Sequence, residues 1–437
     1  MPNPEQIRII SLLSFIILMV LGFRRPILCV VAYMILVYCK LSSYYPILGI
    51  IRAESLFAVI IFVGLIIKGD VKQKLFGKNK QINKYFIIFI IWVFVNYMVF
   101  AWDKAYSWDN AVYHFIKVII LYIMIIVSID NERDFKFFFY SFLFMFMYLA
   151  YEPSYYFLNK TGGDVHMYGV NYIASIGLLS GHVALANNMN QMIPLALYII
   201  YSKQKIIQKI LISLPLIFFL IALVGSGSRG GVVGLAVFGC IFIFNSKNRL
   251  KTFVTVFLIL SVVFVSSNSL TSTATRIDNE SAAGRFIGLT HGIGIFLKGN
   301  IFGVGPGCYL FARKYYFSYT MESHNIYGQV IGDLGFPGVI IWFMFIKQLF
   351  KNLSESKKRL IDNYMENSSL YWIVTGMQAS LIVRLVISMA SHGLYYFYWY
   401  VMAAMSVSIL NLTKNRENSD LEFDHVVYKN SRKKLLK

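Results

Sequence analysis

The chain has 437 residues, of which 57% are hydrophobic and 14% are charged, and its formal net charge at pH 7 is +20. A composition this apolar excludes an ordinary soluble protein and is typical of a chain that crosses the membrane many times. The positive charge alone would suit a nucleic-acid-binding protein, but the basic residues are gathered in short loops between apolar segments.

Apolar segments recur along the whole chain, with lengths near the roughly 20 residues that cross the hydrocarbon core of a bilayer. They cover residues 7–23, 26–39, 46–67, 85–101, 111–129, 135–151, 183–201, 207–224, 230–245, 250–267, 334–350, 369–390 and 394–412. The first two are short and count either as two helices or as one hairpin. The sequence therefore predicts an all-α polytopic membrane protein with about 12 to 13 transmembrane helices. Because no cleavage site of a signal peptide is recognised before the first segment, we expect that helix to remain as an anchor.

The basic residues predict the orientation of these helices. The loop 68–85 carries six lysines and one aspartate, and further basic stretches follow at 202–209, 245–251 and 347–359. They alternate with weakly charged loops at 102–110, 152–182, 225–229 and 267–324. By the positive-inside rule the basic loops are cytoplasmic. We therefore expect a single transmembrane domain over 1–412, a large extracytoplasmic loop at 268–324 within it, and a cytoplasmic basic tail at 413–437.

Two polar features precede the main motifs on the outer side. Arg52 and Glu54 lie near the outer end of the third segment, and we expect them to pair with each other. The stretch "GHVALANNMNQMIP" (181–194) places several asparagines at the outer start of a helix. They serve either as caps and helix contacts or as ligands for a sugar or a phosphate.

The first glycine-rich motif is "GSGSRGG" (225–231), an outer turn with Arg229 at the start of the next helix. It lacks the Gly-Lys-Ser/Thr ending of a nucleotide-binding loop and faces away from cytoplasmic ATP. The alternatives are tight helix packing through small residues, with Arg229 extending to the membrane surface, and an anion site. An arginine beside flexible backbone N–H groups suits a pyrophosphate, which a guanidinium binds in a bidentate manner.

The second motif is "GRFIGLTHGIGIFLKGNIFGVGPGCY" (284–309). Its apolar residues at helical spacing predict an amphipathic helix on the outer membrane surface; they are Phe286, Leu289, Ile293, Phe296 and Leu297. Arg285 lies at the start of this helix, and "GVGPG" ends it with residues that permit a sharp turn. Taken alone, Arg285 is an ordinary arginine of a membrane surface.

The third motif is "ESHNIYGQVIGDLGFPG" (322–338). Asp333 would be costly at the centre of a bilayer and Pro337 breaks a helix. We therefore expect a short helix over 325–333 at the membrane surface and a true span that begins near 334, with His324 at the mouth of the membrane. The other outer-side histidines are expected to have ordinary structural roles; they are His166, His182, His291 and His392.

In this order the three motifs resemble those of the O-antigen ligase and Wzy-type polymerase family, over roughly residues 170–350. The resemblance implies a membrane glycosyltransferase of the GT-C kind, which acts in the synthesis of polysaccharide or lipopolysaccharide. Such an enzyme takes a saccharide from a polyprenyl (undecaprenyl) pyrophosphate donor on the outer leaflet of the inner membrane and transfers it to an acceptor hydroxyl. The chain departs from the family where Leu289 and Thr290 replace a frequent aromatic residue, and where Lys298 to Asn300 replace a proline-containing approach to "GVGPG".

The resemblance also assigns roles to residues. Arg229 and Arg285 correspond to the family's pyrophosphate-binding arginines, and His324 corresponds to the histidine that acts on the acceptor. Asn325, Asn188 and Asn190 are further candidates for substrate binding. The chemistry agrees, because a neutral imidazole suits a general base and two arginines can stabilise a leaving pyrophosphate without a metal. We expect no cofactor and no metal, and the partners are the lipid-linked donor, a glycan or lipid acceptor and the bilayer.

Two other classes of function remain at this stage. A lipid-linked sugar flippase would have the same helix count and charge, although such transporters usually have internal repeats, which this sequence does not show. A non-enzymatic assembly protein of the cell envelope would not depend on His324. Within the enzyme class, the ligase and the polymerase share every motif, and the donor sugar, acceptor and linkage are not encoded in any of them.

The alternation of charge makes the topology testable. A reporter fused after residue 300 is expected to be extracytoplasmic, and one fused after residue 78 cytoplasmic, because the Lys-rich loop stays inside. Paired alkaline phosphatase and green fluorescent protein fusions measure both positions. If both positions lay on one side of the membrane, the predicted orientation would be wrong.

Overall fold

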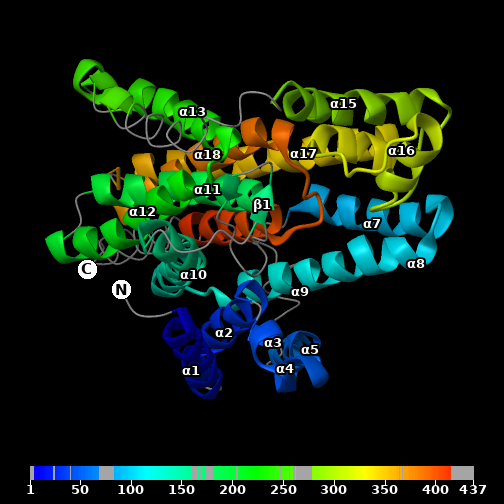
Figure 1. Cartoon of the computed structure of the whole chain (residues 1–437). Helices are drawn as coiled ribbons and strands as arrows, with labels where there is room; N and C mark the ends of the chain where they lie inside the picture. Colours follow the sequence, from blue (N-terminus) through cyan, green and yellow to red (C-terminus); the bar gives the residue numbers. More distant parts are fainter. Residues whose placement is uncertain are drawn as a thin grey trace, which may run out of the picture.

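The computed structural model describes residues 4–22, 25–39, 41–67, 83–159, 165–167, 170–172, 181–202, 205–246, 248–254, 256–258, 261, 278–363, 365–366 and 368–414. Within these residues the chain is almost entirely helical (Figure 1). One hairpin is present there, formed by β1 (Val165–Met167) and β2 (Val170–Tyr172), which pair antiparallel with Val165 opposite Tyr172.

The helices follow the predicted segments in chain order. Those of the N-terminal part are α1 (Pro4–Gly22), α2 (Pro26–Tyr38), α3 (Leu41–Tyr44), α4 (Pro46–Ile50), α5 (Ala53–Ile67), α7 (Lys84–Phe100), α8 (Lys104–Ser107), the π-helical turn η1 (Trp108–Val112), α9 (Tyr113–Ser128) and α10 (Glu132–Asn159). Those of the C-terminal part are α11 (His182–Tyr201), α12 (Ile206–Gly225), α13 (Arg229–Asn245), α15 (Asp278–Leu297), α16 (Tyr309–Phe317), α17 (Ile326–Asp362), α18 (Ser369–Ile387) and the 3-10 turn η3 (Ser388–Ala390). A last helix covers 397–414.

Several of these helices can cross a membrane. Among the described residues, five are long and apolar enough, namely Glu5–Gly22, Lys104–Ser128, Ile206–Gly225, Ile326–Asp362 and Ser369–Ala390. Shorter apolar helices include α2, α5, α7 and α13. The protein is therefore an all-α polytopic membrane protein, as predicted. Of the predicted segment 250–267, residues 255, 259–260 and 262–267 lie outside the described residues.

The third predicted segment is not one continuous helix. α4 ends at Ile50 and α5 begins at Ala53, with Arg52 at a φ of 47° between them. The prediction that Arg52 and Glu54 pair with each other is also wrong. Glu54 lies in the first turn of α5 and instead forms an ion pair with Lys117 of α9 (2.8 Å). It also accepts a hydrogen bond from Ser42 (3.0 Å), so this carboxylate joins three segments.

The basic stretch 347–359 is helical rather than a loop. α17 continues to Asp362, well past the predicted end of the span at residue 350. The extension is stabilised by an ion pair from Arg359 to Glu355 one turn earlier (3.1 Å), and Lys414 of the last helix contacts the same carboxylate (3.4 Å). Ion pairs between residues four apart stabilise a helix. The lysines of this stretch indicated a loop and did not reveal this helical extension.

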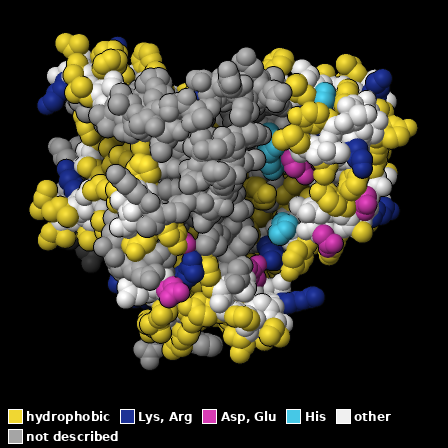
Figure 2. Space-filling model, in the orientation of Figure 1, with side chains coloured by type: hydrophobic (Ala, Val, Ile, Leu, Met, Phe, Trp, Pro, Cys, Tyr) yellow, Lys and Arg dark blue, Asp and Glu magenta, His cyan; other side chains and the backbone are white. Residues whose placement is uncertain are grey.

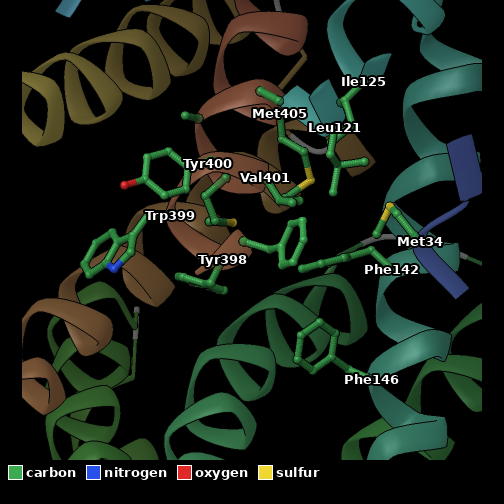
Figure 3. Packing of buried hydrophobic residues seen from close by; sticks show 14 of the residues in the cluster. Met34, Leu121, Ile125, Phe142, Phe146, Tyr398, Trp399, Tyr400, Val401 and Met405 are labelled. Carbon is green, nitrogen blue, oxygen red and sulfur yellow. The ribbon is translucent and has the colours of Figure 1, made fainter. Parts of the chain in front are cut away.

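The last helix forms the centre of the molecule (Figure 1). Side chains on all its sides are buried, from Phe397 to Leu410, which is typical of a helix enclosed by other helices. Figure 3 shows Tyr398 to Met405 among residues of α2, α9 and α10, including Met34, Leu121 and Phe142. The ring of Tyr400 also lies 5.0 Å from that of Phe86 in α7. The start of this helix is therefore firmly positioned, which matters for the segment 391–396 that precedes it.

α17 is broken at the predicted place. Gly335 has φ 65° and ψ −167°, a conformation that is essentially restricted to glycine, so the helix is interrupted two residues before Pro337. The segment 326–334 is thus a separate short helix, as predicted. The backbone groups released by the break are bonded by residues 301–305, at the start of the "GVGPG" segment, and by α7. Val304 N donates to Gly332 O and Gly305 N to Asp333 O (both 3.0 Å), Phe336 N donates to Ile301 O (2.9 Å), and Trp92 Nε1 donates to Leu334 O (3.0 Å).

Asp333 holds this junction together. Its side chain is fully buried, and its carboxylate accepts hydrogen bonds from Tyr309 N at the start of α16 (2.8 Å) and from Tyr395 OH (3.2 Å). The predicted place of Asp333 at the membrane surface did not anticipate these partners. The carboxyl group from α17 thus caps α16 and reaches the segment 391–396, because a buried polar group is tolerated when it is hydrogen-bonded.

Removal of this carboxylate is expected to destabilise the protein. Asp333→Ala leaves buried donors of Tyr309 and Tyr395 without an acceptor, and each costs about 1 to 3 kcal/mol. Thermal unfolding in detergent measures the effect, with Asp109→Ala, at an exposed aspartate of η1, as the control. An unchanged midpoint for Asp333→Ala would contradict the role assigned to Asp333.

Candidate functional site

His324 occupies a constrained position directly before α17. Its φ is 46°, which is uncommon for a residue other than glycine and is found at strained functional sites. The residues on both sides hold it there. Ser323 Oγ donates to Asn325 O (2.6 Å), and the Asn325 side chain caps α17 by accepting from Tyr327 N (3.0 Å) and Gly328 N (3.1 Å). Asn325 therefore has a clear structural role besides its predicted one in substrate binding.

The start of α17 is bonded to the end of α18 and the segment that follows it. Asn325 Nδ2 donates to Met389 O (2.9 Å), and Tyr327 OH donates to Leu385 O (2.8 Å). Gln329 Oε1 accepts from Gly393 N (3.1 Å) and Leu394 N (3.2 Å). These contacts join segments about 60 residues apart and place residues 391–394 beside His324.

His392 belongs to this site, although the sequence indicated only an ordinary structural histidine. Its ring centroid lies 5.1 Å from that of His324, with the rings inclined by 59°. Burial lowers the pKa of His392 to about 4, with smaller contributions from the neighbouring His324 and Arg384. The His392 ring is therefore neutral at neutral pH. Histidine side chains are visible on one face of the molecule, beside α15 and near the start of α17 (Figure 2).

α15 packs against the other side of His324. A Cβ atom at Gly288 would collide with the backbone of Ser323, and one at Gly292 would collide with the backbone of Gly328. These glycines allow α15 to approach α17 closely, as small residues do between membrane helices. Arg285 is three residues, or about one turn, before Gly288 in α15, so its backbone lies near the loop that carries His324. Its side chain lies outside the described residues.

The other face of α15 is apolar and exposed. Phe286, Ile293 and Leu297 are solvent-exposed on the helix, whereas Gly288, Gly292 and Ile295 are buried. The predicted amphipathic helix is therefore present as the later part of α15. An exposed apolar stripe on a membrane protein suits contact with lipid, and its place at the membrane surface stays a prediction.

Arg313 fixes the segment before His324. The Arg313 side chain is 1% exposed, and its Nη1 donates to the carbonyls of Met321 and Glu322 (both 2.8 Å). Its Nε donates to His291 Nδ1 (3.0 Å), which assigns the ring proton to the other nitrogen. Burial and the nearby Arg313 charge lower the pKa of His291, which favours this neutral acceptor. His291 thus has a structural role, as expected, whereas Arg313 was not singled out, because only folding brings α15, α16 and residue 321 together.

Arg229 begins α13, and its side chain is exposed. The turn before it covers residues 226–228, between α12 and α13. α13 approaches α11 and α18 through glycines, since Asn190 Nδ2 donates to Gly231 O (2.8 Å) and a Cβ atom at Gly234 would collide with Asn190 and Ile387. The helix of Arg229 thus packs against the end of α18, which also holds the segment with His392.

The remaining asparagines have helix contacts. Asn190 is buried and makes the bond to Gly231, and Asn188 Nδ2 donates to Ala184 O within α11 (2.7 Å). These are the helix contacts that the sequence offered as one of two readings. No group of three or more histidine, cysteine, aspartate or glutamate residues that could hold a metal ion occurs in the described part of the chain.

Residues 214–343 match the family model of O-antigen ligases. This part of the chain is similar to the O-antigen ligase family. This match confirms the resemblance predicted from the sequence, and it includes Arg229, Arg285 and His324 within its bounds. It supports a glycosyltransferase of the ligase or polymerase type. No curated protein matches the chain.

Proposed function

We propose that this protein transfers a saccharide from a polyprenyl pyrophosphate, such as undecaprenyl pyrophosphate, to the hydroxyl of a glycan or lipid acceptor. The reaction takes place on the extracytoplasmic face of the inner membrane and needs no metal. The packing of Gly288 against Ser323 carries this proposal, because it sets the helix of Arg285 beside His324. The O-antigen ligase match supports the same class of reaction.

The proposed chemistry divides between the histidine and the arginines. His324 removes the proton of the acceptor hydroxyl, whose oxygen then attacks the anomeric carbon of the donor sugar. The bond from that carbon to the pyrophosphate oxygen breaks, and its electron pair leaves with the pyrophosphate. Arg229 and Arg285 bind this anion and stabilise the charge that develops on it. Configuration at the anomeric carbon is inverted.

The surroundings of His324 suit this task. Its backbone is held by Ser323 and Asn325, and the Arg313 contacts fix the residues before it. A base held in one orientation loses little entropy when the acceptor arrives. Glu322 precedes His324 by two residues, and burial raises the pKa of its carboxyl, with Arg313 opposing the shift.

The arginines can be tested by charge-conserving substitution. Arg229→Lys and Arg285→Lys are each expected to lower transfer by about tenfold to 100-fold, because an ammonium does not reproduce a bidentate guanidinium. Transfer is measured with purified protein and the lipid-linked oligosaccharide. Arg133→Lys, at an exposed position of α10, is the control. Full activity of both lysine variants at normal expression would exclude the proposed role.

His324 can be tested separately from donor binding. His324→Ala is expected to bind the lipid-linked donor normally but to transfer sugar about 10²- to 10⁴-fold more slowly, which is the usual contribution of a general base. Added divalent metal should not restore the rate. His182→Ala, at an outer-side histidine that begins α11, serves as the control.

Two other results would change the assignment of His324. Loss of donor binding together with transfer would make it a substrate ligand rather than a base. Transfer near the wild-type rate would remove it from the mechanism, as a flippase or an assembly protein would predict.

A further inference from the structure

Arg384 is a buried cation close to the proposed site. It lies in the last turn of α18, and only 4% of its surface is exposed. Its guanidinium carbon lies 5.5 Å from the ring centroid of Tyr398 and 5.5 Å from that of Trp399. Both rings belong to the central helix, so the guanidinium is held between α18 and the start of that helix.

The charge of Arg384 has no anionic partner among the described residues. No carboxylate there forms an ion pair with it, and its Nε is buried without a hydrogen-bond acceptor. The ring contacts and the carboxyl end of α18 are favourable for a cation. They do not supply an acceptor for the guanidinium, and a buried unpaired charge is strongly disfavoured. A protein retains a buried unpaired charge at a place where a bound ligand supplies the missing partner.

The end of the guanidinium faces the segment beside His324. A Cβ atom added to Gly393 would lie 3.6 Å from Arg384 Nη2. Gly393 directly follows His392, whose ring is 5.1 Å from that of His324. Gly393 N is itself bonded to Gln329 of α17 (3.1 Å). The cation therefore approaches His324 from the side of α18, whereas α15, the helix of Arg285, packs against the residue before His324.

We propose that Arg384 is a third cationic residue of the donor site and binds a phosphate of the polyprenyl pyrophosphate. This inference rests on the proposed function. When the bond from the anomeric carbon to the pyrophosphate oxygen breaks, the electron pair stays on that oxygen and the acceptor proton goes to His324. Arg384 remains protonated throughout and stabilises the departing anion by charge and by N–H donation. A phosphate of an anionic membrane lipid offers the same chemistry, so the test must separate the two sources.

A ligand role and a structural role predict opposite effects on the free protein. If Arg384 is kept for a ligand, then Arg384→Met, with an apolar side chain of similar length, removes an unpaired buried charge and leaves the melting temperature unchanged or higher. If Arg384 is kept for packing against Tyr398 and Trp399, the same change lowers the melting temperature. Arg384→Lys keeps the charge without the planar fork and should bind pyrophosphate with intermediate affinity.

The experiment uses the full chain in nanodiscs of phosphatidylcholine. Binding of undecaprenyl pyrophosphate is measured by microscale thermophoresis, with undecaprenol and phosphatidylglycerol as separate ligands. Wild-type protein should bind the pyrophosphate far more tightly than the other two. Arg384→Met should weaken that binding by more than about tenfold, with no loss of thermal stability. Arg359→Met is the matched control, because Arg359 lies at the far end of α17 in an ion pair with Glu355 (3.1 Å).

The outcomes separate this inference from the proposed function. Wild-type affinity in Arg384→Met, or a clearly lower melting temperature, would overturn the role of Arg384 while the proposed function stands. Tight binding of phosphatidylglycerol that is lost in Arg384→Met would assign the group to a membrane lipid instead. If wild-type protein binds undecaprenyl pyrophosphate no better than undecaprenol, the proposed function itself fails, and this inference fails with it.

Discussion

The site depends on one break in a membrane helix. A broken helix leaves backbone N–H and C=O groups without their helical partners, and where these groups are buried the break is stable only if other protein groups bond to them. In α17 these groups are Val304, Gly305, Ile301 and Trp92. The break therefore requires the "GVGPG" segment to lie against α17, and this in turn positions α15 and α16 at the end of the helix. His324 lies at the start of the short helix 326–334 that the break separates from the rest of α17.

The same break explains why the site draws on segments distant in sequence. Asp333, one turn before Pro337, joins the start of α16 to Tyr395 near the start of the central helix. Gln329, one turn earlier, bonds the segment 393–394. A single face of the short helix thus fixes both the start of α16 and the segment 391–396 that follows α18. Small residues on another face of this helix let α15 approach. His324 therefore lies between α15 and the segment 391–396, and the positions of both depend on α17.

The sequence was sufficient for features with a local cause. Apolar periodicity predicted the helices, Gly335 and Pro337 predicted the break, and three ordered motifs identified the family. It failed where a property depends on a distant partner. Glu54 forms an ion pair with Lys117 rather than with its neighbour Arg52, because α5 lies against α9 there. His392 looked ordinary because its relation to His324 exists only after residues 325–329 bond to residues 385–394. Asp333 was predicted to lie at the membrane surface because a carboxylate is costly at the centre of a bilayer, and the sequence did not reveal its partners Tyr309 and Tyr395, which are distant along the chain.

Asp333 and Arg384 show how two buried ionisable side chains in one protein can have different purposes. The Asp333 carboxylate has backbone and hydroxyl donors in the folded chain, so its electrostatic demands are met before any substrate binds. The Arg384 guanidinium meets ring faces, and its Nε has no acceptor in the described part of the chain. A satisfied charge stabilises an arrangement, whereas an unsatisfied one raises the free energy of the empty site. An anion that binds there recovers this free energy, which is a physical reason for the proposed transferase to place such a cation beside His324, its proposed base.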